Sequence, residues 1–586
     1  MVEPYRDASR SVQDRVEDLL ARLTLQDKAG LMFHDIVAMG PGGQLMTADN
    51  AFGRPGTETA IRDLRLNHFN LAGQLNDVRE LVAWHNRVQE LALATGPGIP
   101  VTLSTDPRHA FSNNPGTEAL AGAFSQWPQS LGLAALDDPD LVRRYADIVR
   151  QEYLAAGLRV ALHPQIDLAT EPRWARIGMT FGEDADLTSR LVAAYIRGLQ
   201  GTELGRSSVA TMTKHFPGGG PQKDGEDPHF AYGREQVYPG DEREYHLRPF
   251  RAAIAAGTSQ IMPYYGMPVG TDWAEVGFAF NTDVITGLLR GELGFDGIVC
   301  TDWGLITDSV ILGQPMPARA WGVEHLSELD RAQWIIDAGC DQFGGESRPE
   351  LVVELARSGR VSQDRIDRSV RRLLREKFVL GLFDQPFLDV DHAVATIGRA
   401  DFVAAGEATQ RAAIVRLTAA ASGPATLPLG TDHAVYAENI GPAAAARLGR
   451  VVADPSDADL AVLRLDAPYE PRPGGFESFF HAGSLEFPAD ERDRIVAICR
   501  QLPTIIVLFL DRPAVVPEIA AAAAALFVEF GARDDAVVDV LLGHAHARGR
   551  LPFDLPSSTQ AVVDSRTDTP YDTTDPVFRF GDGIVD

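Results

Sequence analysis

Short apolar runs alternate with longer segments of helical periodicity over residues 95–345. Segments such as 139–157 repeat their apolar residues every three to four positions, which predicts amphipathic helices between the runs. Repeated strand–helix units predict parallel strands joined by crossover helices, and six or more units favour a (β/α)8-type barrel in the α/β class. The predicted strands are IPVTLSTD (99–106), LRVALHPQIDL (158–168), VATMTKHF (209–216), SQIMPYYG (259–266), GIVCTDWG (297–304) and AGCDQF (338–343).

The C-terminal end of each predicted strand is polar. Asp106, His215, Tyr265 and Asp302 all lie where an apolar run stops. Because the active sites of (β/α)8 barrels lie at the C-terminal ends of the strands, we expect these side chains to converge on one mouth. In the run at 297–304, the strand delivers a carboxylate beside an indole, and a glycine follows at once.

A second α/β region follows the segment 377–394. Alanine and valine become more frequent, and strand patterns return at 459–466, 504–511 and 524–531, separated by helical patterns. This pattern predicts a smaller α/β sandwich domain after the barrel. We therefore divide the chain into a barrel domain at 1–385, a linker at 386–404, an α/β sandwich domain at 405–560 and a C-terminal tail at 561–586.

Charge and cysteine content narrow the class of protein. The chain carries 81 acidic and 54 basic residues, for a net charge of −27. Such a surface repels nucleic acid and anionic membranes, so we expect neither as a partner and favour a neutral substrate. Three scattered cysteines and the absence of metal-ligand or phosphate-loop spacing predict no cofactor and no metal. The start, MVEPYRDASR, lacks the apolar core of a secretory signal, which predicts a cytoplasmic protein; self-association is left open.

The residues at the predicted mouth suit a neutral polyol. Carboxylates and cationic donors can hydrogen-bond adjacent hydroxyls, and an indole can cover the apolar face of a sugar ring. Two carboxylates could also act as nucleophile and general acid. The set is Asp106, Arg108, His109, Arg173, Lys214, His215, Asp302 and Trp303. For Arg108 and His109, shaping the loop is the alternative role.

Several of these positions also have a structural interpretation. A strand-end aspartate such as Asp302 can cap a helix, and Arg173 can pair with a nearby glutamate on the surface. Lys214 and His215 are adjacent, and neighbours on a regular strand point to opposite faces. Both reach a ligand only if the strand ends or bulges there, and Pro217 with the glycines after it favours such a break.

Five motifs in order resemble glycoside hydrolase family 3 over nearly the whole chain. They are RLTLQDKAGLM (22–32), EPRWARIGMTFGED (171–184), KHFPGGG (214–220), TDWG (301–304) and, in the second domain, HARGRLPFDLP near residue 550 with FRFGDGI (578–584). The resemblance implies a β-glucosidase-like enzyme of the two-domain type. It implies retaining exo-hydrolysis of a non-reducing terminal β-linked sugar, with glucose the expected sugar and a small carbohydrate or glycoside the substrate.

The resemblance also implies roles for the matched residues. Asp302 matches the nucleophile, which attacks the anomeric carbon and forms a glycosyl-enzyme. The other matches bind the sugar. Asp106 matches an aspartate that binds two hydroxyls, and Trp303 matches the aromatic residue beside the nucleophile. The three hydrogen-bond donors match Arg173, Lys214 and His215, and Tyr265 matches a tyrosine near the nucleophile. Tyr264 becomes the matching tyrosine if the motif slips by one residue.

The general acid is expected from the second-domain loop at 466–488. Retention requires a second carboxyl about 5–5.5 Å from the nucleophile, and two-domain members of the family supply it from such a loop. Glu486 lies where the loop returns to a helix and is expected to be structural. Glu477 is favoured because it lies eight residues before Leu485, at the loop's exit, and Glu470 is the reserve.

A third candidate acid lies in the barrel domain. Asp227 and His229, in GEDPHF, resemble the Asp–His acid/base of the family's N-acetylglucosaminidases, although they fall two residues later and Gly219 replaces the usual histidine. The presence of a full second domain favours the glutamate. The alternative functions are a β-xylosidase or β-N-acetylglucosaminidase of the same family, and a non-catalytic sugar-binding protein on this fold. Asp302 argues against the last, since binding alone needs no nucleophile.

Some positions depart from the family pattern. Met179 stands where a glutamate is usual, Ala175 replaces a glycine, and GARDD (531–535) replaces a Pro-Gly-Gln-Glu-Gly turn. These departures concern the substrate rather than the reaction. The segment 32–69 is rich in glycine and has no clear period, so we expect an elaborated loop or excursion near the mouth, on the leaving-group side.

Overall fold

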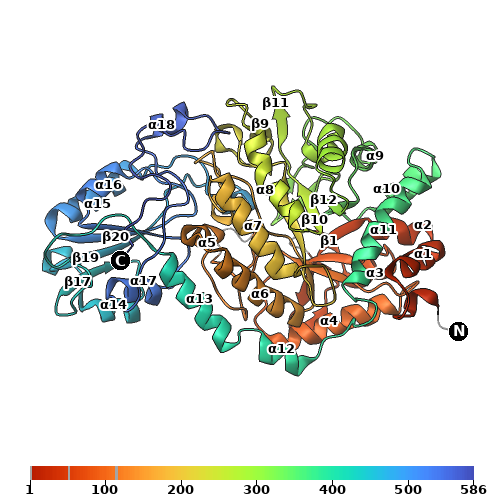
Figure 1. The fold of residues 1–586 in the computed structure, drawn as a ribbon, viewed down its shortest axis with the longest axis horizontal. Helices are drawn as coiled ribbons and strands as arrows, with labels where there is room; N and C mark the ends of the chain where they lie inside the picture. The colour runs from red at the N-terminus through yellow and green to blue at the C-terminus, as the bar shows by residue number, and fades with distance from the viewer. Residues whose placement is uncertain (1–2, 50–52, 112–116, 586) are drawn as a thin grey trace.

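A closed barrel and a separate sheet domain make up the protein (Figure 1). The computed structural model describes residues 3–49, 53–111 and 117–585. Eight parallel strands form the barrel, and the last of them pairs with the first to close it. This architecture confirms the predicted fold class. The strands are β1 (Phe33–Gly40), β5 (His68–Ala72), β6 (Thr102–Thr105), β7 (Leu158–Ala161), β8 (Ala210–Phe216), β10 (Gln260–Pro263), β12 (Ile298–Trp303) and β15 (Gln342–Gly344).

Helices connect the strands and cover the outside of the barrel (Figure 1). Several begin at a side chain that accepts a hydrogen bond from the first turn, as Asp138 does from Leu141 N and Asp184 from Leu187 N. In order they are α3 (Thr57–Arg62), α4 (Val78–Leu93), α6 (Pro139–Ala155), α7 (Ala185–Gln200), α8 (Arg243–Ala255), the π-helical segment Asp283–Glu292, α9 (Glu328–Ala338), α10 (Pro349–Arg357) and α11 (Gln363–Val379); α1 (Val12–Arg22) and α2 (Leu25–Leu31) precede β1.

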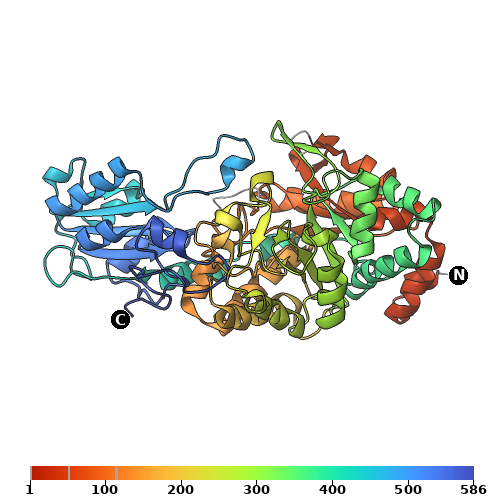
Figure 2. The ribbon, with the colours of Figure 1, turned by 90° about the horizontal axis from the view of Figure 1, so that it is seen from above.

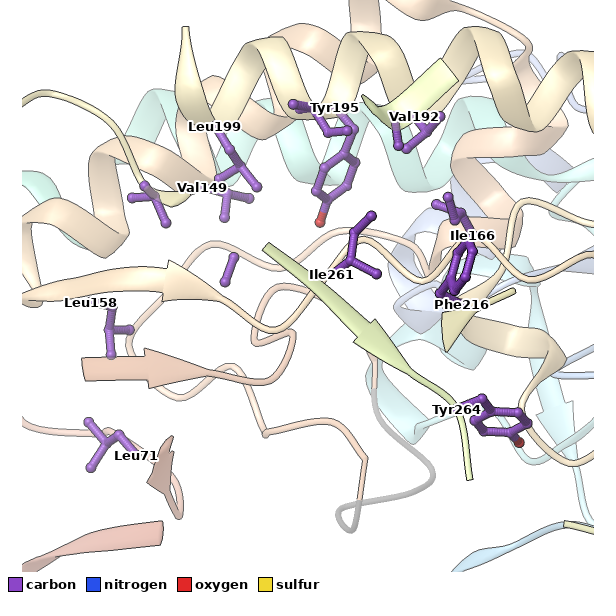
Figure 3. Close-up of a cluster of buried hydrophobic side chains, with 14 of the residues drawn as sticks. Leu71, Val149, Leu158, Ile166, Val192, Tyr195, Leu199, Phe216, Ile261 and Tyr264 are labelled. Carbon is purple, nitrogen blue, oxygen red and sulfur yellow. The ribbon is translucent and has the colours of Figure 1, made fainter. Parts of the chain in front are cut away.

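Two layers of apolar packing hold the barrel together. Figure 3 shows the outer layer, where Val192, Tyr195 and Leu199 of α7 lie over Ile261 of β10. A separate cluster joins neighbouring strands and includes Met262, which also lines a cavity at the mouth. The apolar packing of the strands therefore ends at the floor of that cavity, as the polar strand ends predicted.

Strands β1 and β5 were not predicted, and the expectation of a loop or excursion over 32–69 is wrong where that segment forms β1 and the first residues of β5. Both strands carry polar residues at buried positions, so neither forms an apolar run. His34 and His68 are buried, and burial lowers the pKa of His34 to about 3, which keeps its ring neutral. His34 hydrogen-bonds Ser104 at 2.7 Å and packs on Trp303, so the polar pattern of β1 supports the mouth.

Two excursions rise beside the mouth. The first contains β2 (Gln44–Leu45), β3 (Ala48–Asp49) and β4 (Arg54–Pro55), and apart from 50–52, which lie outside the described residues, it agrees with the predicted excursion. The second is the hairpin of β13 (Ser309–Ile311) and β14 (Gln314–Met316), which follows β12. A two-stranded ribbon, β9 (Glu235–Val237) with β11 (Met267–Val269), lies beyond the ends of β8 and β10.

The second domain has a sheet with both faces buried. Along β19 and β20 the side chains alternate between two apolar clusters: Ile505 and Val507 belong to one, and Ile506 and Leu508 to the other. The sheet order is β16 (Val415–Arg416), β21 (Ala525–Glu529), β20 (Thr504–Phe509), β19 (Leu460–Asp466), β17 (Ala434–Glu438) and β18 (Arg450–Val452). The covering helices are α14 (Pro442–Leu448), α15 (Ala489–Gln501), α16 (Pro517–Ala522) and α17 (Asp534–Leu541).

The chain between and after the domains ties them together. Helices α12 (Val390–Thr396) and α13 (Ala400–Ala413) precede the sandwich, and α13 contacts both α17 and the barrel helix α5 (Ser130–Leu136). The tail contains α18 (Thr559–Asp564) and then lies on the barrel, where Asp568 accepts hydrogen bonds from Gly240 N and Glu242 N. The two domains therefore pack as neighbours over several contacts.

The loop at 466–488 leaves the sandwich and reaches toward the barrel mouth; Figure 2 shows it in light blue above the barrel. Arg512 holds its base. This arginine is buried and donates to the carbonyls of Pro468, Ala482 and Ser484 on the loop and to that of Arg173 on the barrel. The loop is therefore anchored to both domains at its base.

Candidate active site

A cavity of about 250 Å³ opens at the C-terminal ends of the barrel strands. This volume lies below the roughly 300–1,000 Å³ typical of pockets for drug-sized ligands, so the cavity suits a single sugar ring with part of a leaving group. Strand ends supply six of its polar lining residues, and Tyr265 follows β10. The strand-end residues are Asn70, Asp106, Lys214, His215, Asp302 and Trp303.

Asp302 lies near the end of β12 and is 6% exposed. Its Oδ1 accepts a hydrogen bond from Trp303 N at 2.9 Å. Its Oδ2 is buried and has no hydrogen-bond partner within the described part of the chain; His215 Nε2 lies 3.8 Å away. Since a buried carboxylate oxygen without a donor is costly, Oδ2 is the atom that remains for a ligand.

His215 faces Asp302 from β8 and is held from behind. Its Nδ1 lies 2.7 Å from Asp167 Oδ2, and Asp167 Oδ1 accepts hydrogen bonds from His215 N and Gly219 N. Burial lowers the pKa of His215 well below its ordinary value, and burial raises the pKa of Asp167 to about 6. A neutral ring with its proton on Nδ1 therefore turns Nε2 toward the cavity as an acceptor.

Lys214 also faces the cavity, although it is adjacent to His215. Lys214 pairs with Met262 of β10, whereas the next pair joins Phe216 to Pro263, so His215 is the extra residue of an irregularity. This is the break in the strand that the sequence required, and both side chains line the cavity.

Asp106 forms a polar group with two neighbours. Asn70 Nδ2 donates to Asp106 Oδ2 at 2.9 Å, and Lys214 Nζ donates to Asp106 Oδ1 at 3.3 Å. Asn70 Oδ1 is buried without a partner in the described chain. Carboxylate, amide and ammonium groups in contact can accept from and donate to neighbouring hydroxyls, as a sugar requires.

Trp303 and Tyr265 form a rigid corner of the cavity. Tyr265 Oη donates to Trp303 O at 2.9 Å and accepts from Trp303 N at 3.0 Å. The indole lies against Gly345, where an added Cβ would be 2.5 Å from its Cδ1. Tyr264 is buried behind the ring of His215 and is not part of the lining, so Tyr265 is the tyrosine that faces the cavity.

Arg173 does not join these residues. Its guanidinium forms a two-point ion pair with Glu171, the structural role considered from the sequence, and it does not line the cavity. Arg176, three residues later, lines the cavity instead, is 4% exposed and donates to Gln165 Oε1. The motif at 171–184 contains both arginines, and the sequence alone did not distinguish them.

Arg108 and His109 act as supports. Arg108 is fully buried and donates to Thr105 Oγ1 and to the carbonyls of Gly73 and Leu71, which brings the ends of β5 and β6 together. His109 lies 2.9 Å from buried Glu152. Neither lines the cavity, so they have the loop-shaping role.

The glutamates of the 466–488 loop lie outside the cavity lining. Glu477 begins a short 3-10 turn, and its Oε1 accepts a hydrogen bond from Tyr232 Oη. Glu470 is exposed and lies beside Gly483 at the base of the loop. The loop residue that lines the cavity is Phe476, next to Glu477.

The third candidate pair does reach the cavity. His229 lines it and packs on Tyr265 with ring centroids 4.6 Å apart; its Nδ1 lies 2.6 Å from Asp227 Oδ1. Burial lowers the pKa of His229, against the opposing effects of Asp227 and Asp302. Burial acts to raise the pKa of Asp227, but the effects of His229 and Arg176 together exceed it, and the pKa is lowered. The charge of Asp302 is therefore close enough to act on His229.

Some lining residues were not anticipated. Asn70 lies on the unpredicted strand β5, and Arg54 lies on the excursion that starts from β1. Ile311 ends β13 of the second excursion, and Arg319 follows the β13–β14 hairpin. The sequence of such excursions has no regular spacing of apolar residues. The expectation of a loop or excursion near the mouth was therefore the only indication of these residues.

Neither a metal cluster nor a membrane helix is found in the described chain. No group of three or more histidine, cysteine, aspartate or glutamate side chains in residues 3–49, 53–111 and 117–585 is arranged to hold a metal ion. The helices of these ranges are all too short or too polar to cross a bilayer.

The sequence matches the models of one family along most of its length. Residues 46–376 match the glycosyl hydrolase family 3 N terminal domain, and residues 334–585 match the glycosyl hydrolase family 3 C-terminal domain. The two matches follow the barrel and the sandwich in order.

Similar proteins cover nearly the whole chain. Probable beta-glucosidase C of Aspergillus flavus is 53% identical over 581 residues, 99% of this chain and 91% of its own length. Beta-glucosidase C of Emericella nidulans is 53% identical over 585 residues, 99% of this chain and 93% of its own length. A periplasmic beta-glucosidase/beta-xylosidase of Dickeya chrysanthemi is 37% identical over 604 residues, 100% of this chain and 91% of its own length.

Solved structures show the same fold at lower identity. A β-glucosidase of Erythrobacter marinus has a TM-score of 0.79 at 21% identity and covers 100% of this chain and 84% of its own. An exo-1,3/1,4-β-glucanase of a Pseudoalteromonas species has a TM-score of 0.78 at 20% identity, over 100% of this chain and 96% of its own. Together with the family matches and the relatives of 53% identity, they lead to one conclusion: the chain belongs to glycosyl hydrolase family 3 and is a glycoside hydrolase.

Proposed function

We propose that the protein is an exo-acting β-glucosidase that retains anomeric configuration, with Asp302 as its nucleophile. The observation that carries the proposal is the free Oδ2 of Asp302, buried at the end of β12 in a cavity lined by hydroxyl-binding side chains. The names of the relatives that are 53% identical over nearly the whole chain support glucose as the sugar.

The reaction follows from this arrangement in two steps. The terminal sugar binds with its hydroxyls on Asp106, Lys214 and His215. Asp302 Oδ2 attacks the anomeric carbon, the bond to the leaving oxygen breaks, and an acid gives that oxygen a proton. In the second step the same group, now a base, takes a proton from water, which attacks the glycosyl-enzyme and frees the sugar.

Exo action is supported by the walls of the cavity. The β13–β14 hairpin packs beside the second-domain loop, where Gly475 lies next to Leu312 and Gln314. Phe476 from that loop and Arg54 from the first excursion both reach the cavity lining. These walls leave room for a chain end, and they obstruct a polysaccharide passing through the site.

We favour His229, held by Asp227, as the acid/base. His229 lines the cavity, and its Nδ1 contacts Asp227, which leaves Nε2 to exchange a proton with the leaving oxygen. Glu477 is the alternative named by the family resemblance. It is bound to Tyr232 outside the lining, and it would need to turn past Phe476 to reach the leaving oxygen.

A β-xylosidase is the second candidate, because the relative at 37% identity carries both activities in its name. A panel of 4-nitrophenyl β-glycosides tests the sugar: kcat/KM should be highest for the glucoside. Proton NMR of early product tests retention, since the β-anomer should appear first and then mutarotate. Early α-glucose would exclude a glycosyl-enzyme on Asp302, and preference for the xyloside would move the assignment to the second candidate.

A further inference from the structure

Arg319 occupies the space beside the glycine of the TDWG motif. Its backbone N donates to Gly304 O at 3.0 Å, just after the hairpin of β13 and β14. Gly304 has φ +71°, and a Cβ there would lie 2.7 Å from Arg319 Nη1. A glycine after Trp303 is therefore required both by the backbone and by the guanidinium.

Within the described part of the chain, the Arg319 side chain is a buried cation without a hydrogen-bond or ion-pair partner. It is 3% exposed, and Nε is buried with no hydrogen bond. Across the ranges that the structure describes, its guanidinium forms no hydrogen bond and no ion pair; its contact is with the Tyr265 ring, at 5.8 Å from the centroid. Burying a charge unpaired costs several kcal/mol in proteins, so such a group is expected to meet a ligand.

Other buried arginines in the described chain have at least one protein partner: Arg176, which also lines the cavity, donates one hydrogen bond to Gln165, and three further arginines have several partners each. Arg15 forms a two-point ion pair with Asp384, Arg108 donates to three oxygens, and Arg512 donates to five carbonyls. These three hold the fold together. Arg319 lacks any such role and instead lines the cavity that contains Asp302.

The position of Arg319 is on the leaving-group side of the nucleophile. Asp302 lies within β12, whereas Gly304 and its partner Arg319 lie beyond the end of the strand. Tyr265 is near both residues, since Arg319 lies 5.8 Å from its ring centroid and its hydroxyl bonds the backbone of Trp303, next to Asp302. A sugar seated on Asp106 and Lys214 would therefore direct its leaving group outward, past Arg319.

Apolar side chains accompany this cation. Ile311 and Phe476 line the cavity and belong to one apolar cluster. We call Gly304, Ile311, Arg319 and Phe476 the leaving-group subsite. Beyond the inner group of Asp106, Arg176, Lys214 and Asp302, the charged side chains of Arg54 and Glu118 also line the cavity, and Arg54 lies 3.4 Å from Asp35.

We propose that the leaving-group subsite takes an aromatic aglycone bearing a carboxylate, with Arg319 binding the carboxylate and Ile311 and Phe476 covering the ring. A guanidinium fork matches a carboxylate in a two-point geometry. The protein's net charge of −27 repels anions from the surface generally, so the local cation decides selectivity. The inference rests on the proposed function, because it requires a glycoside with its sugar in the inner part of the cavity.

Two substrates of equal shape test the inference: 4-carboxyphenyl β-D-glucoside and 4-carbamoylphenyl β-D-glucoside. The measured quantity is the ratio of kcat/KM for the acid over the amide, compared between variants so that the intrinsic reactivities of the two phenols cancel. The ratio should fall about tenfold to a hundredfold from wild type to Arg319→Met, because a hydrogen bond to a charged group usually contributes a factor of that size to binding. Arg319→Lys should keep part of it, because the charge remains without the fork.

The matched control is Arg234→Met, which removes an exposed arginine paired with Glu324 and should leave the ratio unchanged. An equal ratio in wild type and Arg319→Met would overturn the inference. So would an equal loss on both substrates, which would place Arg319 on the sugar or in the fold. If the wild type cleaves neither glucoside, the proposed function itself fails and the inference with it.

A second measurement needs no variant at residue 319. Wild-type hydrolysis of 4-nitrophenyl β-D-glucoside is inhibited by added 4-hydroxybenzoate or 4-hydroxybenzamide. The acid should have an inhibition constant lower by about tenfold or more. Equal constants, or tighter binding of the amide, would contradict the inference even if Arg319→Met failed to fold.

Discussion

The barrel mouth and the second-domain loop at 466–488 meet at one cavity and contribute to it differently. The barrel presents polar atoms that line the cavity and have no hydrogen-bond partner among the described residues, above all Asp302 Oδ2. The loop presents the apolar ring of Phe476, while Glu477 is bound to Tyr232 and Glu470 stays at the loop's base.

The difference follows from how each region is built. The barrel residues lie at strand ends and are fixed by second contacts, as Asp167 fixes His215. The loop crosses between domains and is held mainly at its base by Arg512. Rigid elements suit groups that must be placed to within a fraction of an ångström, whereas a loop suits a wall that selects the ligand.

Loss of Asp302 should have the largest effect. Asp302→Ala should lower kcat by a factor on the order of 10⁴ or more, since no other group can form the glycosyl-enzyme. The fold should persist because the side chain lines a cavity, and thermal unfolding checks this. Normal turnover in a folded variant would remove Asp302 from the mechanism.

The choice of acid/base separates the two regions directly. His229→Ala should lower kcat for poorly activated substrates by about 10²–10⁴, and Glu477→Ala should have a much smaller effect. On an activated aryl glucoside, azide should rescue the His229 variant and yield β-glucosyl azide. Rescue in the Glu477 variant instead would transfer the role to the loop, and rescue in the Glu470 variant would move it to the loop's base.

Asp106 should act more strongly on the transition state than on the bound substrate. Asp106→Ala loses two charge-assisted contacts to sugar hydroxyls, and both kcat and kcat/KM should fall about tenfold to a hundredfold. Steady-state kinetics on 4-nitrophenyl β-D-glucoside measure both. A variant with normal kcat and a raised KM alone would mean that Asp106 binds only the ground state.

The pH dependence should carry the signature of His229. Its pKa is lowered from the ordinary 6.5 by burial, against Asp227 and Asp302, with Arg176 lowering it further. As the acid must be protonated in the free enzyme, kcat/KM should decline as pH rises through an apparent pKa below 6.5. The decline should persist in Glu477→Ala. If kcat/KM of Glu477→Ala no longer declined as pH rises, the decline would be assigned to Glu477 instead of His229.

The smallest effect should come from the outer contact between the loop and the barrel. Arg472 forms an ion pair with Glu226 at 2.8 Å, and both are partly exposed. Such pairs contribute about 0–1 kcal/mol, so Arg472→Ala should change kcat/KM by no more than about fivefold. A much larger loss of kcat/KM would show that the loop depends on this exposed ion pair for its position. The loop would then be less firmly held, relative to the barrel mouth, than we propose.

The fold was predictable where side-chain periodicity reports burial. The run at 297–304 is apolar up to Thr301 because β12 crosses the barrel, and its polar end marks the mouth. Strands β1 and β5 were missed because they place polar residues such as His34 and Asn70 at buried positions, where only the three-dimensional contacts explain them. Periodicity cannot detect a strand whose interior face is polar.

The site was predictable in part. Asp106, Lys214, His215, Tyr265 and Trp303 meet around Asp302, as strand-end positions imply. Single-residue choices within a motif were not predictable: Arg173 and Arg176 differ only in which way an irregular loop turns them. Arg319 follows a hairpin with no periodic signal, and its lack of a partner exists only in three dimensions.

The most direct test of Asp302 as nucleophile is mass spectrometry after inactivation with a 2-deoxy-2-fluoro-β-glucosyl fluoride. The 2-fluoro group slows both steps, whereas the activated fluoride leaving group speeds the first, so the glycosyl-enzyme accumulates. A single added fluorosugar should be found, and fragmentation of the labelled peptide should place it on Asp302. A label on any other carboxylate, or time-dependent inactivation of Asp302→Ala, would contradict the assignment on which the proposed mechanism rests.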